Sequence, residues 1–126
     1  MGLDMWLYKK DDTQPNGISE EPVMYWRKAN QIRYWIVTHC PNVSEDENIT
    51  LELTQEQLRQ LQSDIEVVMA NFEKAPEILP TQAGFFFGTT EYDETYFLDL
   101  INTYKALHDI LQSLKPNENV MYHEWW

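Results

Sequence analysis

Apolar residues occur at every second position in two short segments of the chain, which is the pattern of a β-strand. Residues 3–8 show this alternation, and residues 49–53 show it over a shorter stretch. Residues 120–126 are rich in β-branched and aromatic side chains, which favour a further strand. The first and last of these segments share a high content of Met, Trp and Tyr, and we expect them to pair.

Apolar residues recur every three to four positions in three other segments, which predicts amphipathic helices over residues 22–39, 54–72 and 93–114. Thr54 and Gln57 match a capping box at the start of the second helix. The third helix has the widest apolar stripe. We therefore expect it to be the most buried of the three.

Polar segments separate these elements. Residues 9–21 contain Pro-Asn-Gly and predict a mobile loop, and residues 41–48 predict a second loop that includes an acidic stretch. Residues 81–90 hold three Phe between two Gly, which is typical of a strand or of a close-packed loop. The order of elements predicts one α+β domain over residues 1–126, with a small mixed sheet packed against three helices.

Charge narrows the class of partner more than any motif does. The chain has 126 residues and a net charge of −12. Residues 1–43 carry as many bases as acids, whereas residues 44–126 carry sixteen acids against four bases. Nucleic acids and anionic membranes bind basic surfaces, so both would repel this chain. We expect instead a protein partner with a basic surface, and self-association stays open.

Cys40 is the single cysteine, which excludes a disulfide within the chain. The first residues lack the basic and apolar regions of a signal peptide, and no apolar run approaches 18 residues. These features predict a cytoplasmic protein.

Motifs for catalysis, metals or cofactors do not stand out. His39 and Cys40 are adjacent at a predicted helix end and would not face one another. The three histidines lack any metal-ligand spacing, and the Gly84–Gly88 segment lacks the basic residue of a phosphate loop. We expect no metal and no cofactor, and we favour a protein that is not an enzyme. A hydrolase that uses Asp93, Glu94 and His108 remains a minor alternative.

The candidate binding surface lies in the first predicted helix, where Trp26, Asn30 and Arg33 are spaced to share one edge. An indole, an amide and a guanidinium side by side suit a nucleotide-like ligand or an anionic peptide. Residues 81–88 would supply the opposite wall. The candidate ligand- or partner-binding residues are Trp26, Arg27, Asn30, Arg33, Thr81, Gln82 and Phe86. The alternative is that both segments are packing signatures, with Trp26 at the edge of the core.

The two hypotheses differ in the loss of protein stability that they predict when the Arg33 side chain is removed. A residue that only binds a ligand should be an exposed charge, and its removal should cost the fold less than about 1 kcal/mol. We make the same prediction for Gln82. We expect Trp26 and Phe86, by contrast, to matter for folding as well.

Four blocks of the sequence resemble a family of small proteins encoded by bacteriophages and prophages. The blocks are MGLDM at 1–5, YWRKAN at 25–30, LPTQ-x-GFFFG at 79–88 and YDE-x-Y at 92–96. The resemblance implies a phage accessory protein in the cytoplasm of a bacterial host, and it implies no named activity. In this family a His often stands where this chain has Arg33, which weakens an acid–base or metal role for that position, because Arg does not deprotonate.

Charge and resemblance together favour a non-enzymatic binding protein, which binds and inhibits a host defence protein through an acidic surface. The alternative function is a nucleotide-binding sponge that holds a small anionic ligand between the edge with Trp26, Asn30 and Arg33 and the Thr81–Gly88 segment. In either case the site residues would come from the two blocks named above.

Overall fold

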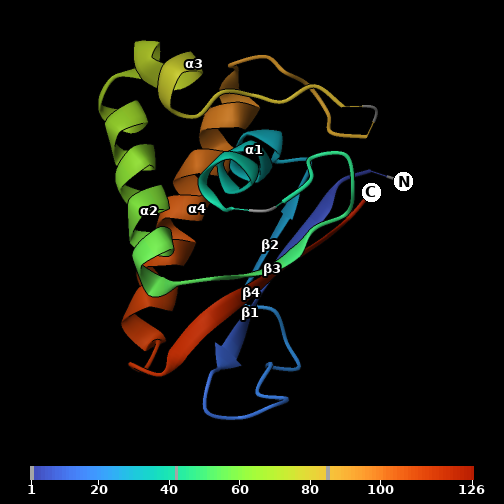
Figure 1. Ribbon diagram of the computed structural model, residues 1–126. Coiled ribbons are helices and arrows are strands. Elements are labelled where there is room, and N and C mark those ends of the chain that lie inside the picture. The colour runs from blue at the N-terminus through green and yellow to red at the C-terminus, as the bar shows by residue number, and fades with distance from the viewer. Residues whose placement is uncertain (1, 42, 85) are drawn as a thin grey trace.

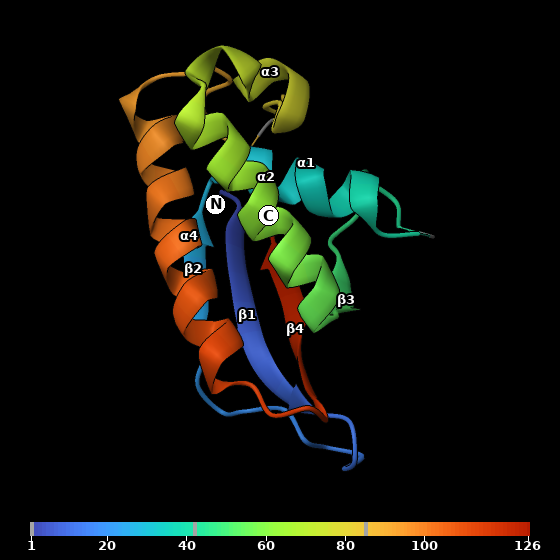
Figure 2. The same cartoon turned by 90° about the vertical axis from the view of Figure 1, so that its left-hand side faces the viewer.

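A computed structural model describes residues 2–41, 43–84 and 86–126 of the chain. Three residues lie outside the described part of the chain: Met1 of the MGLDM block, Asn42 of the predicted 41–48 loop and Phe85 of the 81–90 segment. The chain has an α+β fold, in which helices cover one face of a four-stranded sheet (Figures 1 and 2). This fold class is the one predicted.

The strands of the sheet are β1 (Asp4–Asp11), β2 (Met24–Arg27), β3 (Thr50–Leu53) and β4 (Glu118–Trp125). Their order is β2-β1-β4-β3, and each neighbouring pair is antiparallel. The sheet is therefore antiparallel throughout, whereas the sequence analysis predicted a mixed sheet. The predicted pairing of the first and last strands is confirmed, with Asp4 opposite Trp125. Pairing with β4 also extends β1 to Asp11, three residues into the predicted 9–21 loop.

The helices are α1 (Asn30–His39), α2 (Gln55–Ala70), η1 (Phe72–Lys74), α3 (Ala75–Ile78) and α4 (Glu94–Ser113). The predicted capping box at Thr54 and Gln57 is confirmed, since each side chain bonds the other residue's backbone N–H. Asp93 caps α4 by accepting a hydrogen bond from the backbone N–H of Tyr96. None of the described helices is both long and apolar enough to cross a membrane.

The helix predicted over residues 22–39 is wrong in its first half, where β2 stands. Tyr25 and Trp26 pair with Trp6 and Met5 of β1, and aromatic side chains suit a strand as well as a helix. The chain then turns at Lys28, whose φ of 57° lies in the left-handed region. Its N–H still bonds the carbonyl of Leu3, at 2.7 Å, and α1 begins two residues later.

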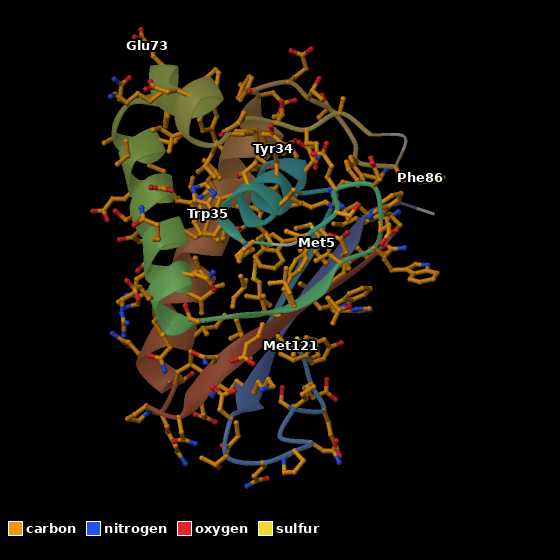
Figure 3. All side chains as sticks on the ribbon, viewed as in Figure 1. Met5, Tyr34, Trp35, Glu73, Phe86 and Met121 are labelled. Atoms are coloured by element: carbon orange, nitrogen blue, oxygen red, sulfur yellow. The ribbon has the colours of Figure 1, made fainter. Side chains whose placement is uncertain are left out.

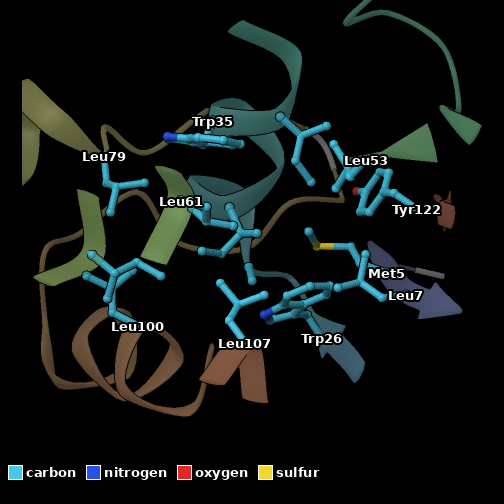
Figure 4. Packing of buried hydrophobic residues seen from close by; sticks show 14 of the residues in the cluster. Met5, Leu7, Trp26, Trp35, Leu53, Leu61, Leu79, Leu100, Leu107 and Tyr122 are labelled. Carbon is cyan, nitrogen blue, oxygen red and sulfur yellow. The ribbon is translucent and has the colours of Figure 1, made fainter. Parts of the chain in front are cut away.

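One hydrophobic core lies between the sheet and the helices (Figure 4). Met5 and Trp35 lie on this side of the sheet, and Met121 lies on the other (Figure 3). The most buried helix is α1, with six of its ten residues buried, and not α4, for which the count is five of twenty. Side chains of α1 bond to three surrounding parts of the chain: Asn30 to the 81–90 loop, Gln31 to the carbonyl of Tyr96 in α4, at 3.3 Å, and Trp35 to Asp64 of α2, at 2.8 Å.

That segment confirms one of the two predictions made for residues 81–90. It forms no strand and is a close-packed loop in its described part. Phe87 is buried, and the carbonyl of Phe86 accepts a hydrogen bond from the N–H of Leu3, at 2.9 Å. The loop therefore lies against α1 and the start of β1.

Candidate functional site

Two of the predicted site residues lie away from the others, because the strand β2 replaces the predicted helix. Trp26 is buried in the core, where its indole N–H donates to the hydroxyl of Thr103 in α4, at 2.7 Å. Arg27 lies on the opposite face of the sheet and pairs with Asp4, at 2.8 Å. The predicted edge shared by Trp26, Asn30 and Arg33 does not exist.

Asn30 joins the two sequence blocks. Its side-chain amide donates to the carbonyls of Phe87 and Thr89, at 2.8 and 2.9 Å, and its oxygen accepts from the backbone N–H of Gln82, at 2.9 Å. The side chain is therefore fully used in holding the 81–90 loop on the first turn of α1. The YWRKAN and PTQ-x-GFFFG blocks do meet, through hydrogen bonds within the protein.

Arg33 is completely buried, so the expectation of an exposed charge is wrong. Its Nε lies 2.9 and 3.0 Å from the two carboxylate oxygens of Glu124. One terminal nitrogen donates to the side chain of Gln82, and the other donates to the carbonyls of Glu45 and Glu47. The guanidinium thus binds the chain's own acceptors, which leaves it poorly placed to bind an external anion.

Glu124 is the buried partner that the sequence analysis missed. It also accepts hydrogen bonds from the backbone N–H of Ile49, the hydroxyl of Tyr122 and the indole of Trp126, at 3.1, 2.6 and 2.9 Å. Burial and the adjacent carboxylate raise the pKa of Tyr122 well above its usual value. Residue 124 follows Val120 and Tyr122 at the inward positions of β4, and this alternation was the available signal of a buried acid.

A hollow of about 260 Å³ lies directly beside this ion pair. Its lining comes from the 43–48 loop, the 81–90 loop and the end of β4: Glu45, Asp46, Gln82, Ala83, Gly84, Phe87 and Trp126. The Phe87 and Trp126 rings form two walls, edge to face at 5.2 Å, and the Arg33 guanidinium lies over both rings. Two exposed carboxylates stand at this hollow, and none of the described residues that line it is a cation.

Gln82 is the predicted residue that faces the hollow most directly. Its amide nitrogen lies 3.3 Å from a carboxylate oxygen of Glu45, while its amide oxygen accepts from Arg33. It is half-buried. Glu45 and Asp46 form the acidic rim of the hollow. Gln82 therefore connects the buried Arg33–Glu124 pair to this rim.

Thr81 and Phe86 are not among the residues that line this hollow. The hydroxyl of Thr81 donates to the carbonyl of Thr90, at 3.0 Å, within the loop itself. Phe86 lines a second hollow, of about 400 Å³, together with Trp125 and Trp126. Of the seven predicted residues, the structure brings together Asn30, Arg33 and Gln82, with Thr81 next to them in the chain.

The residues of the hydrolase alternative do not lie close enough together to act on one substrate. Asp93 and Glu94 stand at the start of α4, and His108 is about 14 residues further along the helix, or about 21 Å away. Burial raises the pKa of the Cys40 thiol, which lowers its reactivity, and His39 stacks on Trp35. Among the described residues, no group of three or more His, Cys, Asp or Glu side chains is arranged to hold a metal ion.

The hollow at Glu45, Asp46, Gln82, Phe87 and Trp126 is therefore the candidate functional site, and its chemistry suits a cation. Comparison with protein-family models, with curated proteins and with solved structures gives no match for this chain.

Proposed function

We propose that this protein is a non-enzymatic binding protein that docks on a basic surface of another protein, with the hollow beside Arg33 and Glu124 receiving a cationic side chain. The observation that carries the proposal is the composition of that hollow. Two carboxylates and two aromatic rings converge on a space large enough for the end of a Lys or Arg side chain.

The charge of the hollow comes from its rim. Arg33 lies beneath it, but Glu124 neutralises this guanidinium at 2.9 Å. Glu45 and Asp46 then dominate the local potential. An anionic ligand would meet these carboxylates and find the Arg33 donors already bound. The geometry therefore favours a basic partner over the nucleotide sponge.

The net charge of the whole chain also favours a basic partner. A net charge of −12 raises the rate of encounter with a basic surface, and this effect weakens as salt screens the charges. The resemblance to phage and prophage proteins makes the expected partner a protein of a bacterial host. Inhibition of a defence protein would follow if the blocked basic surface is one that binds nucleic acid.

A pair of matched variants tests the proposal. Glu45→Gln with Asp46→Asn removes two carboxylates at the hollow, whereas Glu56→Gln with Glu66→Gln removes two exposed carboxylates from α2. The probes are short Arg-rich and Lys-rich peptides, titrated at low salt while the fluorescence of Trp126 and the other tryptophans is followed. A bacterial lysate provides the second probe.

We expect the rim variant to weaken peptide binding at least about tenfold, which is about 1.4 kcal/mol, and the α2 variant to weaken it less than about threefold. Proteins retained from the lysate should leave as salt rises, and they should be lost selectively with the rim variant. Equal weakening by both variants would show diffuse attraction without a site. Absence of any binding at low salt would refute the proposed function altogether.

A further inference from the structure

The face of the sheet that points away from the helices carries aromatic side chains. Trp6 lies at its centre, opposite Tyr25 of β2 and His123 of β4 in the strand register. The ring centroid of Trp6 is 5.8 Å from that of Tyr25 and 5.6 Å from that of His123, and the His123 ring is stacked on it. Register also places Tyr8 and Met121 beside one another on this face.

No described helix covers this face. Figures 1 and 2 show α1, α2 and α4 on one side of the sheet only. Antiparallel sheets with one open face usually carry polar residues there. Here two large aromatic side chains on that face are exposed, Tyr25 by 48% and Trp125 by 64%. A surface of this kind marks an interaction site.

The charges on this face are closer to balance than those of the molecule. Asp4 pairs with Arg27 at 2.8 Å, and Lys10 pairs with Glu52 at 2.8 Å and with Asp12 at 2.9 Å, which gives three acids against two bases. Most of the excess of acidic residues lies in residues 44–126. Two copies of a chain with a charge of −12 repel each other least where these nearly balanced faces approach.

We propose that the face centred on Trp6, with Tyr8, Tyr25, Met121, His123 and Trp125 around it, binds the same face of a second copy of this chain. The two sheets would pack face to face about a two-fold axis, as the two layers of a β-sandwich do. The ion pairs of Arg27 and Lys10 would then face the corresponding ion pairs of the other copy. This proposal does not depend on the acidic hollow.

The size of the face sets the expected affinity. The central strands have eight residues and are about 27 Å long, and the outer strands have four. With strands about 4.8 Å apart, the footprint of the face is about 390 Å² per copy, or about 780 Å² for the two copies together. This is smaller than most stable specific interfaces, so we expect a weak dimer, with a Kd on the order of 100 µM.

Sedimentation equilibrium of the whole chain, from about 1 to 500 µM and at two salt concentrations, tests this proposal. We expect a monomer–dimer equilibrium whose affinity increases several-fold between about 20 and 200 mM NaCl, because salt screens the repulsion between the copies. The opposite sign is expected for a basic partner at the hollow. The two proposals can therefore fail separately.

Substitutions locate the interface. Trp6→Glu and Tyr25→Glu should each abolish the dimer at 500 µM, and Tyr25 provides the second variant if Trp6→Glu does not fold. Leu98→Glu is the control, since it adds the same charge at a side chain of α4 that is 49% exposed, and it should leave the dimer intact. Circular dichroism confirms folding in each case. A chain that stays monomeric at every concentration overturns the proposal, as does a dimer that survives both face substitutions.

Discussion

Arg33 holds together three parts of the protein that are distant in sequence. Its guanidinium binds Glu124 of β4, Gln82 of the 81–90 loop and two carbonyls of the acidic 43–48 loop. Burial of two charges is costly, but here the carboxylate accepts bonds from several donors, and the guanidinium has several acceptors. The ion pair thereby fixes the walls of the hollow to one another.

Removal of one partner should be much more costly than removal of both. Arg33→Met or Glu124→Gln alone is expected to lower the free energy of unfolding by about 3–5 kcal/mol, because a buried charge loses its partner. The double variant should cost less than the sum of the two by at least about 2 kcal/mol. Urea unfolding followed by tryptophan fluorescence gives these values.

Arg59→Met on the exposed surface of α2 is the control and should change stability by no more than about 0.5 kcal/mol. If Arg33→Met were as mild as this control, the ion pair would have no structural importance.

Asp99 gives stability an unusual dependence on pH. Burial raises the pKa of this carboxyl to about 6, although a hydrogen bond from Gln31 acts in the opposite direction. Between pH 4 and 6 the folded protein therefore binds a proton that the unfolded chain has released, so this group makes the fold less stable as pH rises through that window. Asp99→Asn removes the effect and keeps an acceptor for Gln31.

We expect Asp99→Asn to be more stable than the parent by about 1 kcal/mol at pH 7, after allowance for solvent screening, and equal to it near pH 4. Asp109→Asn, at an exposed position of the same helix, should show no such difference. The measurement is the urea midpoint from pH 4 to 8. A constant difference across this range would contradict the assignment to Asp99.

At the scale of elements, the junction of β2 and α1 is where sequence and structure differ most. Alternation and helical spacing correctly predicted β1, β3, α2 and α4, and the content of β-branched and aromatic residues predicted β4. Residues 22–39 also fit a helix along their whole length. Their division depends on pairing with β1, a contact between distant residues that local spacing does not report.

Lys28 lies at this junction, and we expect its replacement by glycine to stabilise the fold. A positive φ of 57° is unfavourable for Lys and costs glycine nothing. Lys28→Gly is expected to raise the free energy of unfolding by about 0.5–1 kcal/mol, whereas Lys105→Gly within α4 should lower it by about 1 kcal/mol. Thermal unfolding of both variants checks the signs. A destabilised Lys28→Gly variant would mean that the lysine side chain contributes more to the free energy of unfolding than the positive φ takes away.

The candidate site was likewise predicted only in part, because it depends on contacts between residues that are distant in sequence. The two sequence blocks that meet in the structure were identified from their unusual density of polar and aromatic residues, and Asn30 and Gln82 are where they join. Glu124 and Trp126 were missed because their role depends on β4 lying beside β1, which brings them under the 43–48 loop. Burial of Arg33 was missed for the same reason, since its partner is 91 residues away.

For the whole molecule, uneven charge is the main electrostatic feature. Sixteen acids against four bases in residues 44–126 place mutual repulsion among the loops and helices around the core. An increase in NaCl from about 20 to 200 mM shortens the Debye length about threefold. Salt should therefore stabilise this protein, although it weakens the few exposed ion pairs.

We expect this increase in salt to raise the Tm by a few degrees. Glu66→Lys with Glu73→Lys, both at exposed positions, should raise the Tm at low salt and reduce the response to salt. Differential scanning calorimetry at both salt concentrations measures this. The measurement is made at concentrations at which the chain is monomeric, so that self-association does not contribute. A Tm that falls with salt would show that attractive pairs dominate.

The place of β4 in the sheet has a consequence for synthesis. β4 is the last element of the chain, yet it lies between β1 and β3 and carries the acid that binds Arg33. At about 5–20 residues per second, a ribosome needs about 4–14 s to advance the 72 residues from the end of β3 at Leu53 to the end of β4 at Trp125. Throughout that time β1 and β3 have no central partner, and the apolar faces of α2 and α4 have no completed sheet to cover. The nascent chain therefore remains exposed to chaperones and proteases at least until β4 has been made, and only then can the four strands of the sheet come together.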